Sequence, residues 1–407
     1  MRTSRLIPIA ATGALLLAAC APNTESGTTP AEDSTTTDAT TTDATTTEES
    51  DANTAAGPGS TQIEEIDLDA LIEAAKAEPA LVVLDGTSKV QSQGELFAET
   101  YGLEIDASKA DASESVEILT REAAAGTITT DVAALSDVPS INNELLASGV
   151  AFAWLPADIA ANIDASQQNP PILINDPAMW SYNTEVYEAC PVSNMWELTD
   201  EEWSGLVALD DPLNNPGTLD WFSQMDQFGN DALEAAYESH YGEAFSSDEG
   251  RSATQEWVAR FAANSPLLTL SSEEASEAIG APGQTTPPVG LLSSAKFRNI
   301  DELGYALGVC EGMEPWVGMA KPKGIVIASG TESPNAAKLW VHFNYTQEGI
   351  QAQIDDGKMS TNSEIVQPED PADIGHHTPN IFTFDGGGVD RDWESRQDWS
   401  DLWRLNN

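Results

Sequence analysis

Short apolar runs alternate with amphipathic segments along most of the chain after residue 78. Apolar runs bounded by turn residues fit strands that are buried on both faces, and they occur at 79–85, 102–106, 131–135, 179–183, 203–209, 288–292 and 324–329. Segments with helical character lie between them, at 95–101, 113–125, 141–147, 231–241, 251–263 and 333–354. Strands that alternate with helices predict an α/β protein, with a mostly parallel sheet flanked by helices.

The first twenty residues have the features of a bacterial export signal. Arg2 and Arg5 precede an apolar stretch at 6–19 that is too short to span a membrane but fits a secretory signal peptide. The stretch ends in Leu17-Ala18-Ala19-Cys20, which resembles the lipobox of bacterial lipoproteins. That resemblance implies that residues 1–19 are removed and that Cys20 carries fatty acyl chains such as palmitate. The alternative is an ordinary signal peptide with a chance cysteine.

Residues 20–60 have the composition of an unstructured tether. They contain a repeated Thr-Thr-Thr-Asp-Ala unit, no aromatic residue and almost no large aliphatic residue. Such a segment cannot bury enough apolar surface to offset its loss of conformational entropy. We therefore expect a disordered, solvated link between a membrane anchor and a folded body.

The charge of the chain excludes one large class of partners. There are 67 Asp and Glu residues against 17 Lys and Arg, which gives a formal net charge of −50. A polyanion repels phosphate backbones, so we expect no nucleic-acid partner. The acids are spread along the chain, as in a solubilising surface. They are also too numerous to single out a catalytic pair, so an exported hydrolase is a weaker hypothesis than a non-enzymatic role.

The cysteine count suggests one disulfide. The chain has three cysteines, and if Cys20 is lipidated, Cys190 and Cys310 remain. An even pair in an exported protein favours a disulfide between them. The alternative is two separate buried thiols, because free cysteine is a residue type that is often buried.

Five stretches in order resemble one family. The likeness covers roughly residues 80–355, and the stretches are 81–84, 130–135, 180–185 with 196–198, 209–212 with 216–218, and 333–338 with 347–349. Together they resemble the extracellular solute-binding proteins of bacterial ABC importers, in the branch that binds ferric iron, thiamine, polyamines or phosphonates. The resemblance implies a two-lobed periplasmic-binding-protein fold, a ligand cleft between the lobes, an importer permease as partner, and no cofactor.

The family fold also implies a division of the chain. We expect a first lobe at 61–178, a second lobe at 179–313, a return to the first lobe at 314–355, and a C-terminal extension at 356–407 that packs on the body. Trp393, Trp399 and Trp403 are expected to dock the last helix. The protein is expected to be an exported monomer, anchored through Cys20 to the outside of the cytoplasmic membrane.

The candidate ligand contacts follow the predicted strands. Open parallel sheets bind ligands beyond the carboxyl ends of their strands. The residues at those ends are Thr87, Ser88 and Lys89; Ser136 and Asp137; Asp211; and Ser293, Ser294 and Lys296. The resemblance adds Ser181, Tyr182, Asn183 and Trp316, which it puts near the segments that cross between the lobes.

The cations and hydroxyls at the strand ends favour an anionic ligand. The chain has few basic residues, and two of them, Lys89 and Lys296, each follow a predicted strand. If the predicted fold is right, the two lysines lie in different lobes and face each other across the cleft. Hydroxyl groups and helix N-termini also suit oxyanions such as a phosphonate or an organophosphate. The alternative is that both lysines are ordinary surface cations.

Ferric members of the branch use neighbouring tyrosines after the strand at 288–292, but this chain has none before Tyr305. We therefore expect no metal site, with ferric iron or a polyamine as the alternative ligands.

Overall fold

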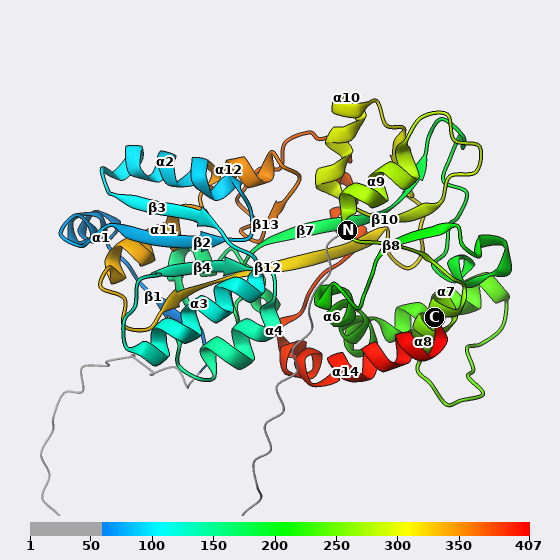
Figure 1. Cartoon of the computed structure of the whole chain (residues 1–407), viewed down its shortest axis with the longest axis horizontal. Helices are drawn as coiled ribbons and strands as arrows, with labels where there is room; N and C mark the ends of the chain where they lie inside the picture. The colour runs from blue at the N-terminus through cyan, green and yellow to red at the C-terminus, as the bar shows by residue number, and fades with distance from the viewer. Residues whose placement is uncertain (1–58) are drawn as a thin grey trace, which may run out of the picture. The chain divides into compact units, whose positions relative to one another are not determined.

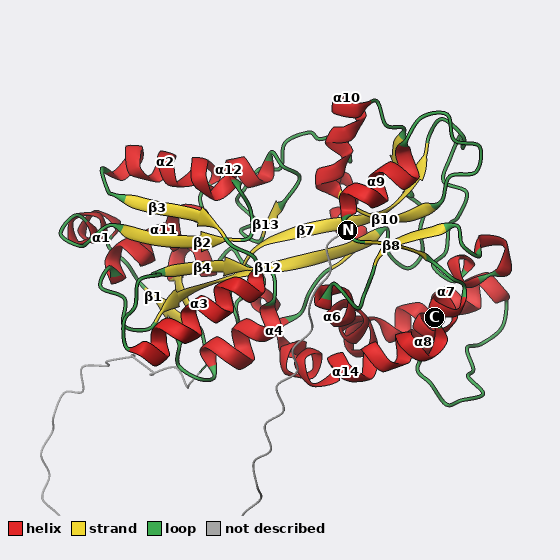
Figure 2. Ribbon diagram, viewed as in Figure 1, coloured by secondary structure: helices red, strands yellow, loops and turns green. Residues whose placement is uncertain are grey.

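The computed structural model describes residues 59–407. The predicted signal peptide, Cys20 and almost all of the predicted tether lie outside the described residues. Figures 1 and 2 show a long mixed sheet with helices on both of its faces. The sheet has 12 strands, and its main path runs through β3 (Ile105–Lys109), β2 (Leu81–Asp85), β4 (Val132–Leu135), β12 (Gly318–Ala328), β7 (Ile172–Asn183), β10 (Val289–Ser293), β8 (Val207–Asp210) and β9 (Leu267–Thr269). Among residues 59–407, no helix is both long enough and apolar enough to cross a membrane.

The first lobe is built around three parallel strands, in which β2 lies between β3 and β4. Its aromatic core joins Phe97 edge-on to Trp340 and Phe343, with ring centroids 5.2 and 5.4 Å apart. Its elements are β1 (Gln62–Glu64), α1 (Leu68–Ala75), β2 (Leu81–Asp85), α2 (Lys89–Tyr101), β3 (Ile105–Lys109), α3 (Ala112–Ala125), β4 (Val132–Leu135), α4 (Val138–Ser140), η1 (Ile141–Leu146), β5 (Ala151–Phe152), β6 (Trp154–Pro156), α5 (Ala157–Ala160), η2 (Ala165–Gln167), α11 (Pro334–Asn344) and α12 (Gln347–Ile354).

The second lobe packs its helices around β8, β9 and β10, and its core contains Phe222, Trp257 and Trp403. Its elements are η3 (Glu197–Thr199), η4 (Glu201–Trp203), β8 (Val207–Asp210), α6 (Pro216–Gln224), η5 (Met225–Gly229), α7 (Asn230–Tyr241), α8 (Ala253–Ala263), β9 (Leu267–Thr269), α9 (Ser272–Gly280), β10 (Val289–Ser293), η6 (Ser294–Arg298), α10 (Asn299–Leu303) and β11 (Leu307–Val309). Cys190 and Cys310 are joined by a disulfide in this lobe, with their Cα atoms 5.0 Å apart.

Two long antiparallel strands run through both lobes. They are β7 (Ile172–Asn183) and β12 (Gly318–Ala328). β12 pairs with β4 of the first lobe, whereas β7 pairs with β10 of the second. The runs predicted at 179–183 and 324–329 are therefore only the ends of longer strands. Polar residues around Asp176 and Lys321 interrupt the apolar pattern at the point where both strands pass between the lobes.

A further difference concerns the predicted helix at 333–354. The structure breaks it at Tyr345 and Thr346 into α11 and α12, and the Thr346 side chain caps α12 by accepting from Gly349 N at 3.1 Å. Gly349 packs so closely that a Cβ there would lie 2.0 Å from the carbonyl oxygen of Phe343. The apolar periodicity continues through the break because both helices bury one face on the same core.

The C-terminal segment touches both lobes. It contains β13 (Met359–Ser360), α13 (Ile374–His377), η7 (Thr378–Asn380), β14 (Ile381–Phe382), η8 (Gly386–Gly388) and α14 (Val389–Asn406). α14 packs mainly on α6 and α8 and also meets α4 (Figure 1). Trp399 and Trp403 are buried as expected, but Trp393 is 37% exposed. The expectation that all three tryptophans dock the helix is therefore wrong for Trp393, whose ring instead lies against the guanidinium of Arg396.

Candidate functional site

A cleft of about 650 Å³ lies where the two lobes meet. The crossing strands supply Ile174 and Asp176 from β7 and residues 319–323 from β12. Loops that follow β2 and β4 line it from the first lobe, together with the start of α3. The second lobe contributes the start of α6 and its inner face. The C-terminal segment completes the lining, which consists of Gly86, Thr87, Ala112, Ser113, Ser136, Asp137, Pro139, Ile174, Asp176, Asn214, Asn215, Pro216, Gly217, Asp220, Trp221, Gln224, Met319, Ala320, Lys321, Pro322, Lys323, Lys358, Phe382 and Phe384.

Three of the eight lysines in the chain line this cleft. Lys323 is buried and donates to Asp85 Oδ1 at 2.7 Å and to Gln353 Oε1 at 2.6 Å. Lys358 Nζ lies 3.0 Å from Asp176 Oδ2. The carboxylate nearest to Lys321 Nζ is Asp210, at 3.7 Å, which is beyond hydrogen-bonding distance. Among residues 59–407, Lys321 is thus the cleft lysine whose N–H groups have no hydrogen-bond acceptor.

Asp176 is the carboxylate that these lysines surround. Burial raises the pKa of Asp176, but Lys358 and Lys321 outweigh that effect and hold it below its ordinary value. The Ser293 hydroxyl also donates to Asp176 Oδ1, at 3.0 Å. Burial lowers the pKa of Lys323, and the neighbouring Asp85 opposes this change. Asp176 therefore stays ionised at neutral pH and neutralises part of the lysine charge.

Uncharged groups complete a surface that suits an oxyanion with an apolar part. The starts of α3 and α6 border the cleft, and helix N-termini present free backbone N–H groups and favour negative charge. Thr87, Ser113 and Ser136 add hydroxyls, and Ile174, Trp221, Met319, Phe382 and Phe384 add apolar area. The lining contains no tyrosine, histidine or cysteine. Within residues 59–407, no group of three or more His, Cys, Asp or Glu side chains is placed to hold a metal ion.

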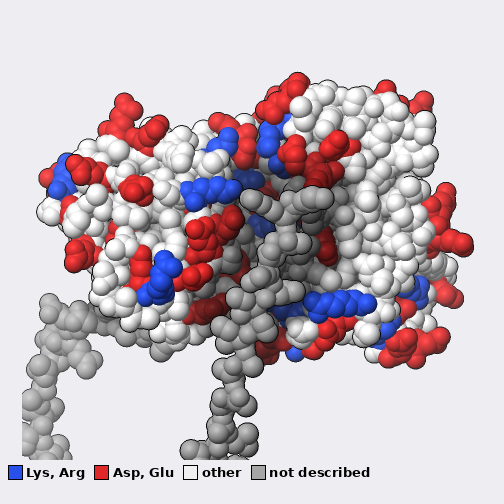
Figure 3. Space-filling model, viewed as in Figure 1, with Lys and Arg blue, Asp and Glu red and all other residues white. Residues whose placement is uncertain are grey.

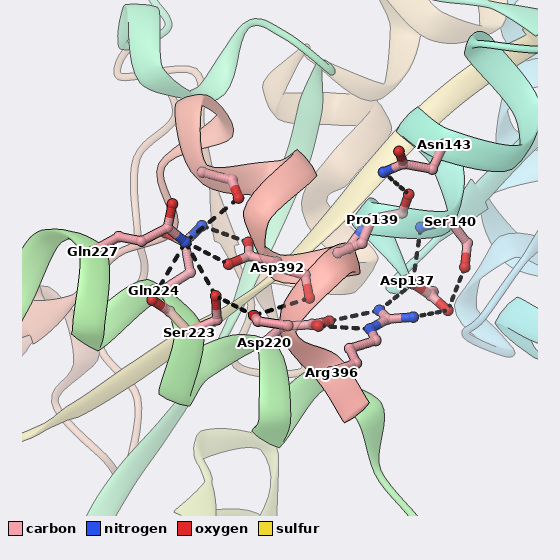
Figure 4. A network of polar contacts seen from close by, with 12 residues as sticks. Asp137, Pro139, Ser140, Asn143, Asp220, Ser223, Gln224, Gln227, Asp392 and Arg396 are labelled. Atoms are coloured by element: carbon pink, nitrogen blue, oxygen red, sulfur yellow. Dashed lines mark hydrogen bonds and ion pairs between the residues drawn. The ribbon is translucent and has the colours of Figure 1, made fainter. Parts of the chain in front are cut away.

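A guanidinium joins two further cleft carboxylates (Figure 4). Arg396 of α14 donates to Asp220 of α6 through Nε and Nη2, both at 2.7 Å. Its Nη2 also donates to Asp137 Oδ1 of the first lobe, at 2.6 Å. Burial raises the pKa of Asp220 to about 6 even though Arg396 opposes the rise. Burial works against the charge of Arg396, but its two carboxylate partners prevail and raise its pKa.

Asp392 lies one turn earlier on α14 and is fully buried beside this network. Its Oδ2 accepts from Gln224 Nε2 at 2.6 Å, and its Oδ1 accepts from Gln227 Nε2 at 2.9 Å. Burial raises the pKa of Asp392 to about 7, although both glutamines and Ser223 favour the ionised form and so oppose the rise. The described hydrogen-bond partners of this carboxyl are neutral. The protonated form of Asp392 is therefore more stable in this buried position than it is in water, relative to the ionised form.

We predict that Asp392 makes the fold less stable as the pH rises. Its pKa is about 7 in the folded chain and 3.8 ordinarily, so its contribution is fully present below pH 3.8 and is lost as the pH rises through 7. The free energy of unfolding of the unchanged chain should therefore fall by about 2 kcal/mol more than that of Asp392→Asn when the pH is raised from 5 to 8. Urea unfolding at both pH values measures this difference, with Glu394→Gln on the exposed face of α14 as the control. If the stability of Asp392→Asn depends on pH as strongly as that of the unchanged chain, the prediction is wrong.

Some of the residues expected from sequence lie at the cleft and others do not. Thr87, Ser136 and Asp137 line it. Ser293 touches it through Asp176, and the Ser294 hydroxyl donates to the carbonyl of Gly357, beside Lys358. Like Ser293 and Ser294, the other predicted residues lie outside the lining: Ser88, Lys89, Ser181, Tyr182, Asn183, Asp211, Lys296 and Trp316.

Local contacts explain why some of these predicted residues do not line the cleft. Ser181 donates to Met179 O and Asn183 to Ile279 O, so both side chains serve the strand and its neighbours. Asp211 accepts from Leu213 N and holds a turn at the end of β8. Trp316 packs against Phe382, which is itself part of the cleft lining.

The structure contradicts the prediction that Lys89 and Lys296 face each other across the cleft. Lys89 Nζ lies 3.7 Å from Asp356, and Lys296 Nζ lies 2.8 Å from Glu273, and neither lysine lines the cleft. Each follows a strand, but each side chain turns to a nearby acid. The cations of the cleft are instead Lys321 and Lys323, within β12, and Lys358. The signal that could have found them is the pattern Lys-Pro-Lys, which interrupts an otherwise apolar strand at the crossing point.

Comparison with known proteins identifies the fold. No family model matches the chain, and no curated protein matches its sequence. Among solved structures, iron-bound HitA from Pseudomonas aeruginosa has a TM-score of 0.59 at 14% identity, covering 81% of this chain and 100% of that one. The periplasmic binding protein AfuA from Actinobacillus pleuropneumoniae, with bound fructose-6-phosphate, has a TM-score of 0.58 at 16% identity, covering 80% and 99%. IdiA (FutA) from Trichodesmium, with iron and citrate, has a TM-score of 0.60 at 11% identity, covering 81% and 99%.

These structures confirm the expected fold class. The chain has the two-lobed α/β fold of periplasmic binding proteins, with helices flanking the sheet in each lobe. The matching structures belong to the group that the five sequence motifs resemble. At 11–16% identity the likeness is one of fold, and the chemistry of this cleft has to be argued from its own residues.

Proposed function

We propose that this protein is an extracellular solute-binding protein that delivers a small oxyanion to the permease of an ABC importer. The ligand is an organophosphate or phosphonate with an apolar or neutral part. The observation that carries the proposal is the group of Lys321, Lys323 and Lys358 in one cleft of a chain with a net charge of −50. Figure 3 shows Asp and Glu side chains spread over the visible face of the molecule, so lysines gathered in one cleft give an anion partners that the acidic surface does not offer.

The fold supports a binding role. Two lobes joined by crossing strands can close around a ligand by a hinge motion, which is how proteins of this architecture hold a solute. The matching structures include one with a bound sugar phosphate and two with bound iron. Ferric iron is the alternative ligand, but iron held through tyrosine has little support, because the lining contains no tyrosine. A polyamine also has less support, because the cleft carboxylates already have cationic partners.

Two measurements on the full chain test the proposal. Native mass spectrometry of freshly purified protein detects a co-purified small molecule and gives its mass. Calorimetry then compares sugar phosphates, alkylphosphonates, polyamines and ferric citrate. We expect one oxyanion to bind per chain and to remain chemically unchanged. Tight binding of a polyamine or of ferric iron, with no response to any oxyanion, would overturn the proposed ligand class.

We further propose that Cys20 carries a lipid that anchors the protein outside the cytoplasmic membrane. The support is Leu17-Ala18-Ala19-Cys20 in register behind an apolar stretch. Cys20→Ala should move the protein from the membrane fraction to the medium, or leave an unprocessed precursor, because acyl chains supply the binding free energy. Fractionation followed by intact mass measurement checks this. Unchanged membrane association of the processed variant would refute the anchor.

A further inference from the structure

The cleft contains a cation-binding position that the chain itself fills. Asp137 from the first lobe and Asp220 from the second both line the cleft, and the Arg396 guanidinium lies between them. With its two bonds to Asp220 and one at 2.6 Å to Asp137, Arg396 uses most of its donors on these carboxylates. Two carboxylates that converge in this way would otherwise suit the ammonium or guanidinium group of a ligand.

The position of Arg396 is fixed by the helix that carries it. Trp399 and Trp403 bury one face of α14 in the second lobe, and Asp392 is held there by Gln224 and Gln227. On the first lobe, Asn142 donates to Asp390 at 2.7 Å. The Trp393 ring lies 5.4 Å from the guanidinium carbon. Arg396 is therefore part of a built network at the edge of the cleft, and Figure 4 shows it lying between the two aspartates.

This arrangement decides which charge one wall of the cleft offers to a ligand. Of the three aspartates in the lining, Asp137 and Asp220 have their cationic partner in Arg396. Without it, Asp137 and Asp220 would face the cleft with no cationic partner. We infer that Arg396 sets the charge selectivity of the cleft, because its guanidinium occupies the site where a cationic ligand group would bind.

The inference rests on the proposed function and narrows it. Arg396 is a positioning residue here, since it acts through Asp137 and Asp220. The solute is an anion that brings no ammonium or guanidinium group to this wall, and polyamines are excluded because their site is already filled. Removing the guanidinium should create a site for small guanidines and amines.

The test is chemical replacement of the missing guanidinium in the full chain. Arg396→Ala is titrated with methylguanidine, agmatine and spermidine by calorimetry, and the thermal midpoint is followed with the same probes. The measurement is made at pH 8, because burial raises the pKa of Asp220 to about 6 even beside Arg396. We expect the variant to bind agmatine at least tenfold more tightly than the unchanged chain does, and agmatine to raise the midpoint of the variant alone. Arg404→Ala, at an exposed position of the same helix, is the matched control and should behave like the unchanged chain.

A second variant keeps the test decisive if Arg396→Ala does not fold. Arg396→Gln retains most of the volume and offers one neutral amide group in place of the guanidinium. It should also gain affinity for spermidine, whereas Arg396→Lys should not. A folded variant without the guanidinium that gains no affinity for any of the three cations would overturn the inference, as would equally tight binding of agmatine to the unchanged chain. These readouts do not use the anionic ligand. A failure of the proposed function, in which no oxyanion binds the unchanged chain, is therefore recognised separately.

Discussion

Lys321→Ala is expected to weaken binding of the oxyanion by roughly ten- to a hundredfold. The Lys321 ammonium lines the cleft on β12, and its nearest carboxylate, Asp210, is 3.7 Å away. A ligand oxygen can therefore take a charge-assisted hydrogen bond without breaking an existing one. Such a bond contributes about 1.5–3 kcal/mol, which corresponds to the stated loss of affinity. Calorimetry with the tightest-binding oxyanion of the panel measures the change.

The change should leave the fold intact, because Asp210 keeps other partners. Its carboxylate accepts from Thr269 Oγ1 at 3.0 Å and from Ser272 Oγ at 3.2 Å. Lys296→Ala is the matched control, since Lys296 pairs with Glu273 outside the cleft. That variant should bind as the unchanged chain does. If Lys321→Ala binds normally while Lys296→Ala loses affinity, the position of the anion site proposed here is wrong.

The parts of the fold that the sequence predicted are those dominated by burial. β2, β4, β8 and β10 are hidden on both faces, so each stands out as a short apolar run between turn residues. Only one end of each crossing strand, β7 and β12, was predicted, because Asp176 and Lys321 line the cleft and interrupt the apolar run. The failure of the pattern thus coincides with the candidate site, where selection for chemistry overrides selection for burial.

The candidate site was predicted less completely for two physical reasons. The end of a strand fixes where a loop begins but not where its side chain points, and so Lys89 and Lys296 turned to Asp356 and Glu273. Contacts between distant segments leave no local signal at all. Arg396 meets Asp137 across 259 residues of sequence, and nothing in the pattern of α14 distinguishes it from an exposed surface arginine.

The disulfide should make a large contribution to the stability of the second lobe. Cys190 and Cys310 are 120 residues apart, so the bond removes much of the conformational freedom of the unfolded chain. Closure of a loop of this length contributes about 3–5 kcal/mol in the chain-entropy account. Cys190→Ala with Cys310→Ala should therefore lower the free energy of unfolding by that amount. Alanine avoids placing a hydroxyl at position 310, which is fully buried.

Tryptophan fluorescence during urea unfolding measures this effect where it should appear. Trp196, Trp257 and Trp403 are buried in the second-lobe core, so the signal reports mainly on that lobe. The unchanged chain treated with a reductant should unfold like the double variant, and the double variant should not respond to the reductant. This comparison separates the loss of the cross-link from any packing change caused by alanine. If the double variant and the oxidised chain unfold at the same urea concentration, the bond does not restrain the unfolded chain as argued.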